Sequence, residues 1–188
     1  MKVALSFLCE EDRRPETIRY MMYGRFSEVC FVFIEKGKEI TVFGTSVHNR
    51  YRRIKLNMKA GGHFEFLLLP VNDEESDKLY ATCDACSKAV KPFNLADILQ
   101  MHVPFREPVE IPLFDTATLN NTQAVILILR ECLEPGNVLR CGIDGLHSRL
   151  TFTETLFDRL RPYTLPVLYA NLQRFAVGEL GETEKDRH

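Results

Sequence analysis

Apolar residues recur in short runs over the first 70 positions of the chain, and polar residues alternate with them. This pattern is typical of strands that have one buried face and one exposed face. Lys-Gly-Lys at 36–38 separates two of the runs, and so short a connection predicts a β-hairpin. The predicted strands are Val3–Leu8, Glu28–Glu35, Glu39–Thr45, Tyr51–Asn57 and His63–Val71.

The rest of the chain is dominated by helical patterns. Asn72 or Asp73 can cap a helix that runs to about position 90, because short polar side chains accept hydrogen bonds from free helical N–H groups. Asn120 or Asn121 can cap the longest apolar helix, Thr122–Leu133, which is apolar on nearly every side and is therefore expected to be buried. Residues 15–23 are predicted to form a short helix or an irregular segment. Further helices are predicted at 95–101, 153–160 and 165–175, and an extended segment at 103–114.

The order of these elements indicates a fold class. Strands that mostly precede helices are typical of α+β proteins rather than of wound parallel sheets. We therefore predict a small antiparallel β-sheet packed against a buried central helix. A length of 188 residues suits one domain, which we place at 1–178. Residues 179–188 are polar, and we expect them to form a disordered tail.

Composition and charge narrow the class of partner. A net charge of −2 and a pI near 6.2 give no electrostatic reason to bind nucleic acid or an acidic membrane. No apolar run approaches the ~18 residues that a membrane span requires. Six cysteines are dispersed along a chain too long to need a disulfide framework, so we expect reduced thiols in the cytoplasm or nucleus. The apolar stretch at 1–9 is short for a signal peptide and predicts a buried first strand.

Three short phrases follow one another in a recognisable order. Phe-Ser-Glu-Val-Cys-Phe-Val-Phe lies at 26–33, Asn-Thr-Gln-Ala-Val-Ile-Leu-Ile-Leu at 121–129, and Pro-Val-Leu-Tyr-Ala-Asn-Leu at 166–172. With a linker-like phrase at 93–99, this order resembles the circularly permuted branch of the NlpC-type, papain-like cysteine hydrolases. The resemblance extends over roughly residues 1–175 and implies a permuted papain-like architecture. In that family the first phrase carries a histidine base, and the second carries a cysteine nucleophile at the start of the central helix.

Both catalytic positions of the family are changed in this chain. Glu28 stands where the resemblance implies the histidine, and Asn121 stands where it implies the cysteine. A thiolate at a helix N-terminus attacks a carbonyl with an imidazole as base, and neither asparagine nor a carboxylate replaces that pair. The resemblance thus implies an inactive pseudoenzyme. Its role would be in protein binding, assembly or virus–host interaction, since permuted members occur in large DNA viruses. Asn121 as a helix cap and Glu28 as a solvated strand residue are the structural alternatives.

An active cysteine hydrolase or acyltransferase with a relocated nucleophile is the alternative function. Cys30 lies two residues from Glu28 and so on the same face of the predicted strand. His48 or His63 could then act as its base. A buried, apolar thiol at Cys30 is the simpler interpretation.

Two other patterns carry candidate chemistry. Cys83 and Cys86 form a lone Cys-x-x-Cys, for which His63 and His102 are the plausible additional zinc ligands. Because the two cysteines fall in the middle of a predicted helix without a second pair, we interpret them as core residues and expect no metal or cofactor. A basic stretch could contact phosphates, but it is more typical of an exposed edge strand. Its members are Arg50, Arg52, Arg53, Lys55 and Lys59.

Overall fold

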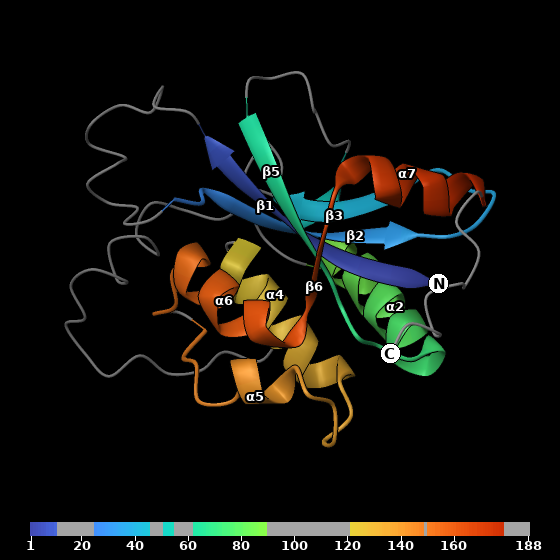
Figure 1. Cartoon of the computed structure of the whole chain (residues 1–188). Coiled ribbons are helices and arrows are strands. Elements are labelled where there is room, and N and C mark those ends of the chain that lie inside the picture. Colours follow the sequence, from blue (N-terminus) through green and yellow to red (C-terminus); the bar gives the residue numbers. More distant parts are fainter. Residues whose placement is uncertain (11–24, 46–50, 55–61, 90–120, 149, 179–188) are drawn as a thin grey trace, which may run out of the picture.

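A six-stranded antiparallel sheet is the centre of the computed structural model, which describes residues 1–10, 25–45, 51–54, 62–89, 121–148 and 150–178 (Figure 1). The strand order is β4-β3-β2-β1-β5-β6, so β1 lies inside the sheet between β2 and β5. The strands are β1 (Lys2–Glu10), β2 (Glu28–Ile34), β3 (Thr41–Thr45), β4 (Tyr51–Ile54), β5 (Gly62–Leu68) and β6 (Leu165–Val167).

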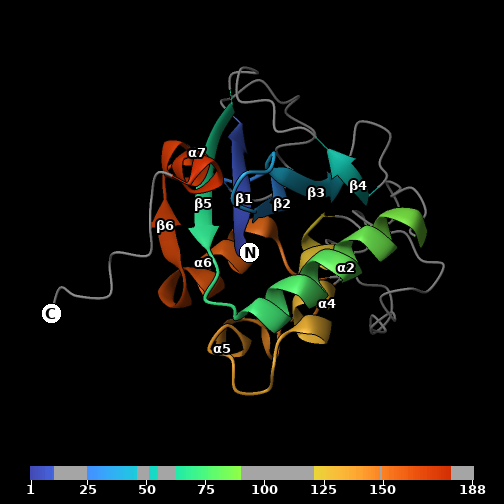
Figure 2. The ribbon, with the colours of Figure 1, turned by 90° about the vertical axis from the view of Figure 1, so that its right-hand side faces the viewer.

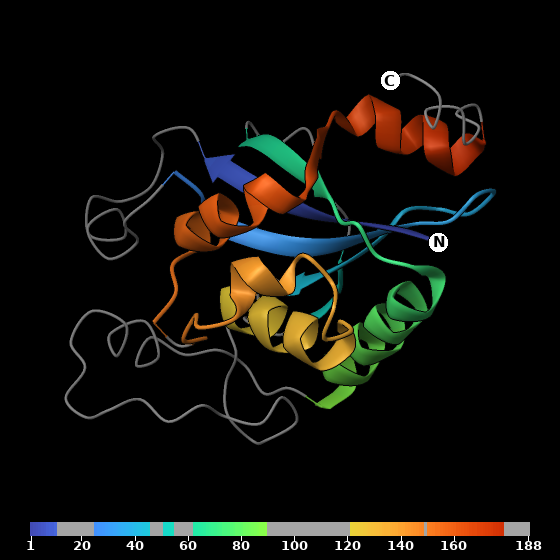
Figure 3. The ribbon, with the colours of Figure 1, turned by 60° about the horizontal axis from the view of Figure 1, so that its bottom comes forward.

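Helices cover both faces of this sheet. Figures 1 and 3 show α7 on one face and the other helices on the opposite face. Figure 2 shows α2 running beside α4 on that second face. No helix within the described ranges has the length and apolar character that crossing a bilayer requires. The helices are α2 (Asp73–Ala89), α4 (Asn121–Cys132), α5 (Arg140–Ile143), α6 (Thr153–Leu160), the 3-10 turn η1 (Arg161–Tyr163) and α7 (Tyr169–Val177).

The larger core lies between the sheet and the helices α2, α4, α5 and α6. Side chains alternate along a strand, so every second residue of β1 and β2 points into it. Helix α4 supplies the opposite surface and is buried along nearly its whole length, as its composition predicts. The strand residues of this core include Val3, Leu5, Phe7, Val29, Phe31 and Phe33, and the helix residues include Leu79, Val125, Ile128, Leu129 and Phe157.

A smaller core lies under α7. It takes the alternate residues of the same strands, including Ala4, Cys30 and Val32. Leu172 and Ala176 of α7 are buried against them, and Lys2 Nζ lies 4.0 Å from the ring centroid of Phe175. The central strands are therefore apolar on both faces, because each face is covered.

Most of the predicted elements are confirmed within the described residues. All five predicted strands form, the hairpin at 28–45 is antiparallel, and the α+β class is correct. Tyr51–Ile54 is an edge strand of the sheet, as the basic stretch predicts. The predictions at 15–23, 95–101, 103–114 and 179–188 lie outside the described residues.

One boundary prediction is wrong. The sequence pattern predicts a helix that begins at Leu165, but Leu165–Val167 pairs with β5 as the edge strand β6. Proline has no N–H to donate and is tolerated at the edge of a sheet but not inside a helix, and Pro166 occupies such an edge position. The helix begins only at Tyr169.

A buried carboxylate joins the start of α2 to the end of α4. Asn72 and Glu75 form a capping box, in which each side chain accepts the other residue's backbone N–H, at 2.8 and 3.1 Å. Glu75 is only 3% exposed, and it also accepts hydrogen bonds from the Glu134 N–H at 3.0 Å and the Asn137 amide at 2.9 Å. These bonds satisfy a buried charge and fix the two helices to each other.

Replacing Glu75 by glutamine is expected to lower the free energy of unfolding by about 2 kcal/mol, because an amide NH2 in place of one oxygen leaves N–H donors without an acceptor. Urea denaturation followed by circular dichroism measures this. Glu74→Gln is the matched control, since Glu74 is an exposed acidic residue of the same helical turn. Equal losses in the two variants would show that only the charge near the helix dipole matters.

Candidate functional site

The first turn of α4 is the position at which the resemblance implies a nucleophile. Asn121 is the first residue of this helix and is 7% exposed. Thr122 Oγ1 lies 2.9 Å from Thr153 Oγ1, so the starts of α4 and α6 are hydrogen-bonded to each other. The buried polar residues of this region are Asn121, Thr122, Gln123, Ser148, Thr151 and Thr153. The start of α4 is therefore an enclosed polar cluster, and Asn121 brings no nucleophile to it.

Glu28 lies on the other side of the sheet from α4. It is half-buried at the start of β2, opposite Leu8 of β1. Its neighbour Val29 packs into the core that contains α4, while Cys30 packs into the core under α7. Since side chains alternate, Glu28 shares the α7 face with Cys30. The structure therefore does not bring Glu28 and Asn121 together on one face.

Cys30 is a packed core thiol. It is 6% exposed, and burial raises the pKa of its thiol well above the usual range. The charge of Glu28 raises this pKa further, while a hydrogen bond from Ser6 has a smaller, opposite effect. A reactive cysteine needs the reverse conditions, a lowered pKa and an accessible sulfur.

His63, the candidate base that lies within the described residues, is not placed beside Cys30. His63 is exposed on β5, paired with Cys9 of β1. Two-residue alternation places His63 on the same face as Leu67, which packs into the larger core, and so on the opposite face from Cys30. His48 lies outside the described residues.

The Cys-x-x-Cys residues are part of the core, as interpreted from their helical position. Cys83 and Cys86 are fully buried in α2. Burial raises the pKa of Cys86 to about 12, and the nearby Cys132 contributes to this rise. Within the described residues no group of three histidine, cysteine or acidic side chains is placed to hold a metal ion. His102 lies outside those residues. Cys141 is an exposed free thiol on α5.

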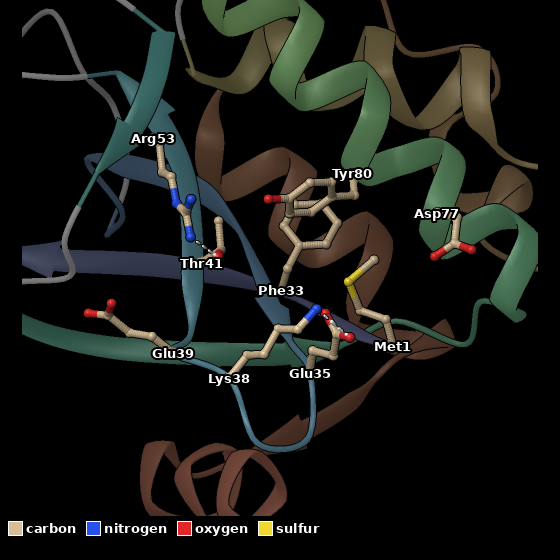
Figure 4. A pocket seen from close by; sticks show the side chains of 9 residues that line it. All are labelled: Met1, Phe33, Glu35, Lys38, Glu39, Thr41, Arg53, Asp77 and Tyr80. Carbon is tan, nitrogen blue, oxygen red and sulfur yellow. Dashed lines mark hydrogen bonds and ion pairs between the residues drawn. The ribbon is translucent and has the colours of Figure 1, made fainter.

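A pocket at the β4 edge of the sheet is a feature that the sequence patterns did not single out. It has a volume of about 760 Å³ and opens between α2, β4 and the β2–β3 hairpin (Figure 4). Its residues come from segments far apart in the chain. Arg53 belongs to the basic stretch, and Phe33 is the last residue of the phrase at 26–33. The lining residues are Met1, Phe33, Glu35, Lys38, Glu39, Thr41, Arg53, Asp77 and Tyr80.

Comparison with known proteins gives no relative for this chain. No family model matches it, and no curated protein or solved structure is significantly similar to it.

Gly44 shows how tightly Cys30 is packed. A Cβ added at Gly44 would lie 2.4 Å from Cys30 Sγ and 3.2 Å from Cys30 Cβ. Gly44→Ala is therefore expected to destabilise the fold by about 1–3 kcal/mol through overpacking. Calorimetric unfolding of the single variant and of the Gly44→Ala, Cys30→Ala double variant tests this.

The double variant should recover part of the loss, because removing Sγ opens space for the new methyl group. Gly136→Ala is the control, since an added Cβ there meets nothing within 4 Å. Independent, additive effects of the Gly44 and Cys30 substitutions would contradict the contact.

Proposed function

We propose that the chain is a non-catalytic protein-binding domain on a scaffold similar to that of the permuted NlpC-type cysteine hydrolases. The observation that carries this proposal is the identity of the residues at two positions, where Asn121 and Glu28 stand in place of the cysteine and histidine that the resemblance implies. Asn121 is buried in a polar cluster at the start of α4, and Glu28 lies on the opposite face of the sheet. An asparagine carries no thiol and a glutamate carries no imidazole, so these two positions supply neither member of a cysteine–histidine pair.

The environment of three of the described thiols supports the same proposal. Burial raises the pKa values of Cys30, Cys86 and Cys132. A raised pKa leaves almost no thiolate at neutral pH, and the thiolate is the attacking form. The relocated nucleophile at Cys30 is further disfavoured by the negative charge of Glu28 beside it. The scaffold would therefore act through what it binds rather than through what it cleaves.

A protein is the proposed partner class. The net charge of −2 offers no attraction for the phosphates of nucleic acid. The pocket at the β4 edge contains Phe33, Tyr80 and Arg53, and aromatic residues and arginine are enriched at protein–protein interfaces. An assembly or virus–host role, which the resemblance implies, would use such a surface.

Site-by-site labelling with iodoacetamide between pH 7 and pH 10, read by mass spectrometry, tests the proposal. Cys30 is expected to stay unlabelled in the folded protein across this range, because its sulfur is buried and its pKa is raised. Cys141 is exposed and should be labelled under the same conditions, which makes it an internal control. Labelling in 8 M urea should modify both.

An opposite result would identify an active enzyme. Fast labelling of Cys30 in the folded protein at or below pH 7, together with ester hydrolysis that Cys30→Ser abolishes, would show that Cys30 is a nucleophile. The domain would then be a hydrolase, and the binding proposal would fail.

A further inference from the structure

The pocket at the β4 edge is built from rigidly held groups on three elements. Thr41 comes from β3, Arg53 from β4 and Tyr80 from α2, while the β2–β3 hairpin closes the pocket on one side. Figure 4 shows the Arg53 guanidinium above Thr41, and the hydroxyl end of Tyr80 turned toward the same space. A volume of about 760 Å³ accommodates several side chains of a ligand.

Arg53 offers hydrogen-bond donors to this space. Its Nη2 donates to Thr41 Oγ1 at 2.6 Å, which fixes the direction of the guanidinium. An arginine has five N–H donors, and within the described residues Arg53 uses one and has no carboxylate partner. A fixed guanidinium with free donors is suited to a carboxylate, which it can bind through two parallel hydrogen bonds.

Tyr80 is oriented by its ring contacts. Its ring meets those of Phe33 and Phe43 edge-on, with centroids 5.2 and 5.6 Å away and interplanar angles of 83°. These contacts hold the ring in place, and the hydroxyl has no hydrogen-bond partner among the described residues. It is therefore a second donor aimed into the space beside Arg53.

The other charges around the pocket are of mixed sign. Lys38 Nζ lies 2.9 Å from Glu35 Oε1, and the hydrogen bond and charge of Glu35 raise the pKa of Lys38, so these two residues balance each other. Glu39 and Asp77 are exposed, and neither has an ion-pair partner within the described ranges. Figure 4 shows Glu39 and Asp77 on opposite sides of the pocket.

We propose that this pocket binds a segment of a partner protein in which an acidic side chain lies between basic ones. The ligand carboxylate binds Arg53 and the Tyr80 hydroxyl, and the basic side chains bind Glu39 and Asp77. This inference rests on the proposed binding function and names its site and the chemistry of its partner.

The charges around the pocket favour such a segment over a polyanion or an apolar ligand. A polyanion would approach the carboxylates of Glu39 and Asp77, which no ion pair within the described residues balances, and like charges oppose each other. A purely apolar ligand would desolvate the Arg53 guanidinium without supplying an acceptor, which is costly. A segment with a central negative charge and flanking positive charges pairs each of these groups.

Binding of the tripeptide acetyl-Lys-Glu-Lys-amide to the full chain, followed by ¹⁵N–¹H chemical shifts, tests the site. The peptide is expected to shift resonances of Thr41, Arg53 and Tyr80, while acetyl-Lys-Gln-Lys-amide should bind at least about tenfold more weakly because it lacks the carboxylate. Arg53→Gln should weaken binding of the Glu peptide by a similar factor. Tyr80→Phe should weaken it less, since one neutral donor is lost.

Arg52→Gln is the matched control. Arg52 is the adjacent residue of the same strand and is also exposed. Because side chains alternate along a strand, Arg52 lies on the opposite face of the sheet from Arg53. It should leave the affinity within about twofold of the wild type. If Arg52→Gln and Arg53→Gln weaken binding equally, the effect is one of net charge and the site is refuted.

Other outcomes separate this inference from the proposed function. Failure of the peptide to shift these resonances at millimolar concentration refutes the pocket, whereas unreactive thiols in the labelling experiment would still support a non-catalytic domain. Free glutamate that binds as tightly as the peptide overturns the partner segment and assigns the pocket to a small molecule. Peptide binding together with a reactive Cys30 would refute the non-catalytic function and leave the pocket in place.

Discussion

Burial of both faces of the central strands is the constraint on which the rest of this structure depends. β1 is hydrogen-bonded to β2 on one side and to β5 on the other, so the three strands belong to one sheet. Because side chains alternate, each strand presents two apolar sets, and each set requires its own cover. Helices α2, α4 and α6 cover one set, and α7 covers the other. The C-terminal helix is therefore part of the core rather than an addition to it.

The same constraint determines what the candidate catalytic residues can do. Cys30 falls in the set covered by α7, where burial and the charge of Glu28 both favour the neutral thiol. Asn121 falls on the side of α4, in a cluster of buried polar side chains. Two groups that react with each other must lie on the same face of the sheet and be open to solvent. In this structure the sheet lies between the candidate positions, and helices cover both of its faces. A binding site is then expected at an edge of the sheet that the helices leave exposed.

The β4 edge of the sheet is such a place. β4 has only four residues, and Arg53 points from it toward α2 without being buried. The hairpin turn between β2 and β3 stands beside it, with Gly37 at a φ of 77° that suits glycine. Polar side chains from β3, β4 and α2 thus meet at a surface where the aromatic core, represented by Tyr80, is partly exposed. Aromatic residues and arginine, both present here, are enriched at surfaces that bind other proteins.

The sequence by itself determined the elements and their class. Alternating apolar runs were sufficient for β1 to β5, and the all-round apolar character of Thr122–Leu133 was sufficient for a buried helix, because both patterns depend on local periodicity. The helical position of Cys83 and Cys86 likewise identified them as core residues. Only the tertiary structure decided that Leu165–Val167 joins the sheet, since a three-residue strand depends on β5 beside it. It alone placed Glu28 and Asn121 on opposite sides, and brought Arg53 and Tyr80 to one pocket. Contacts between residues distant in the chain are set by packing, which local patterns do not encode.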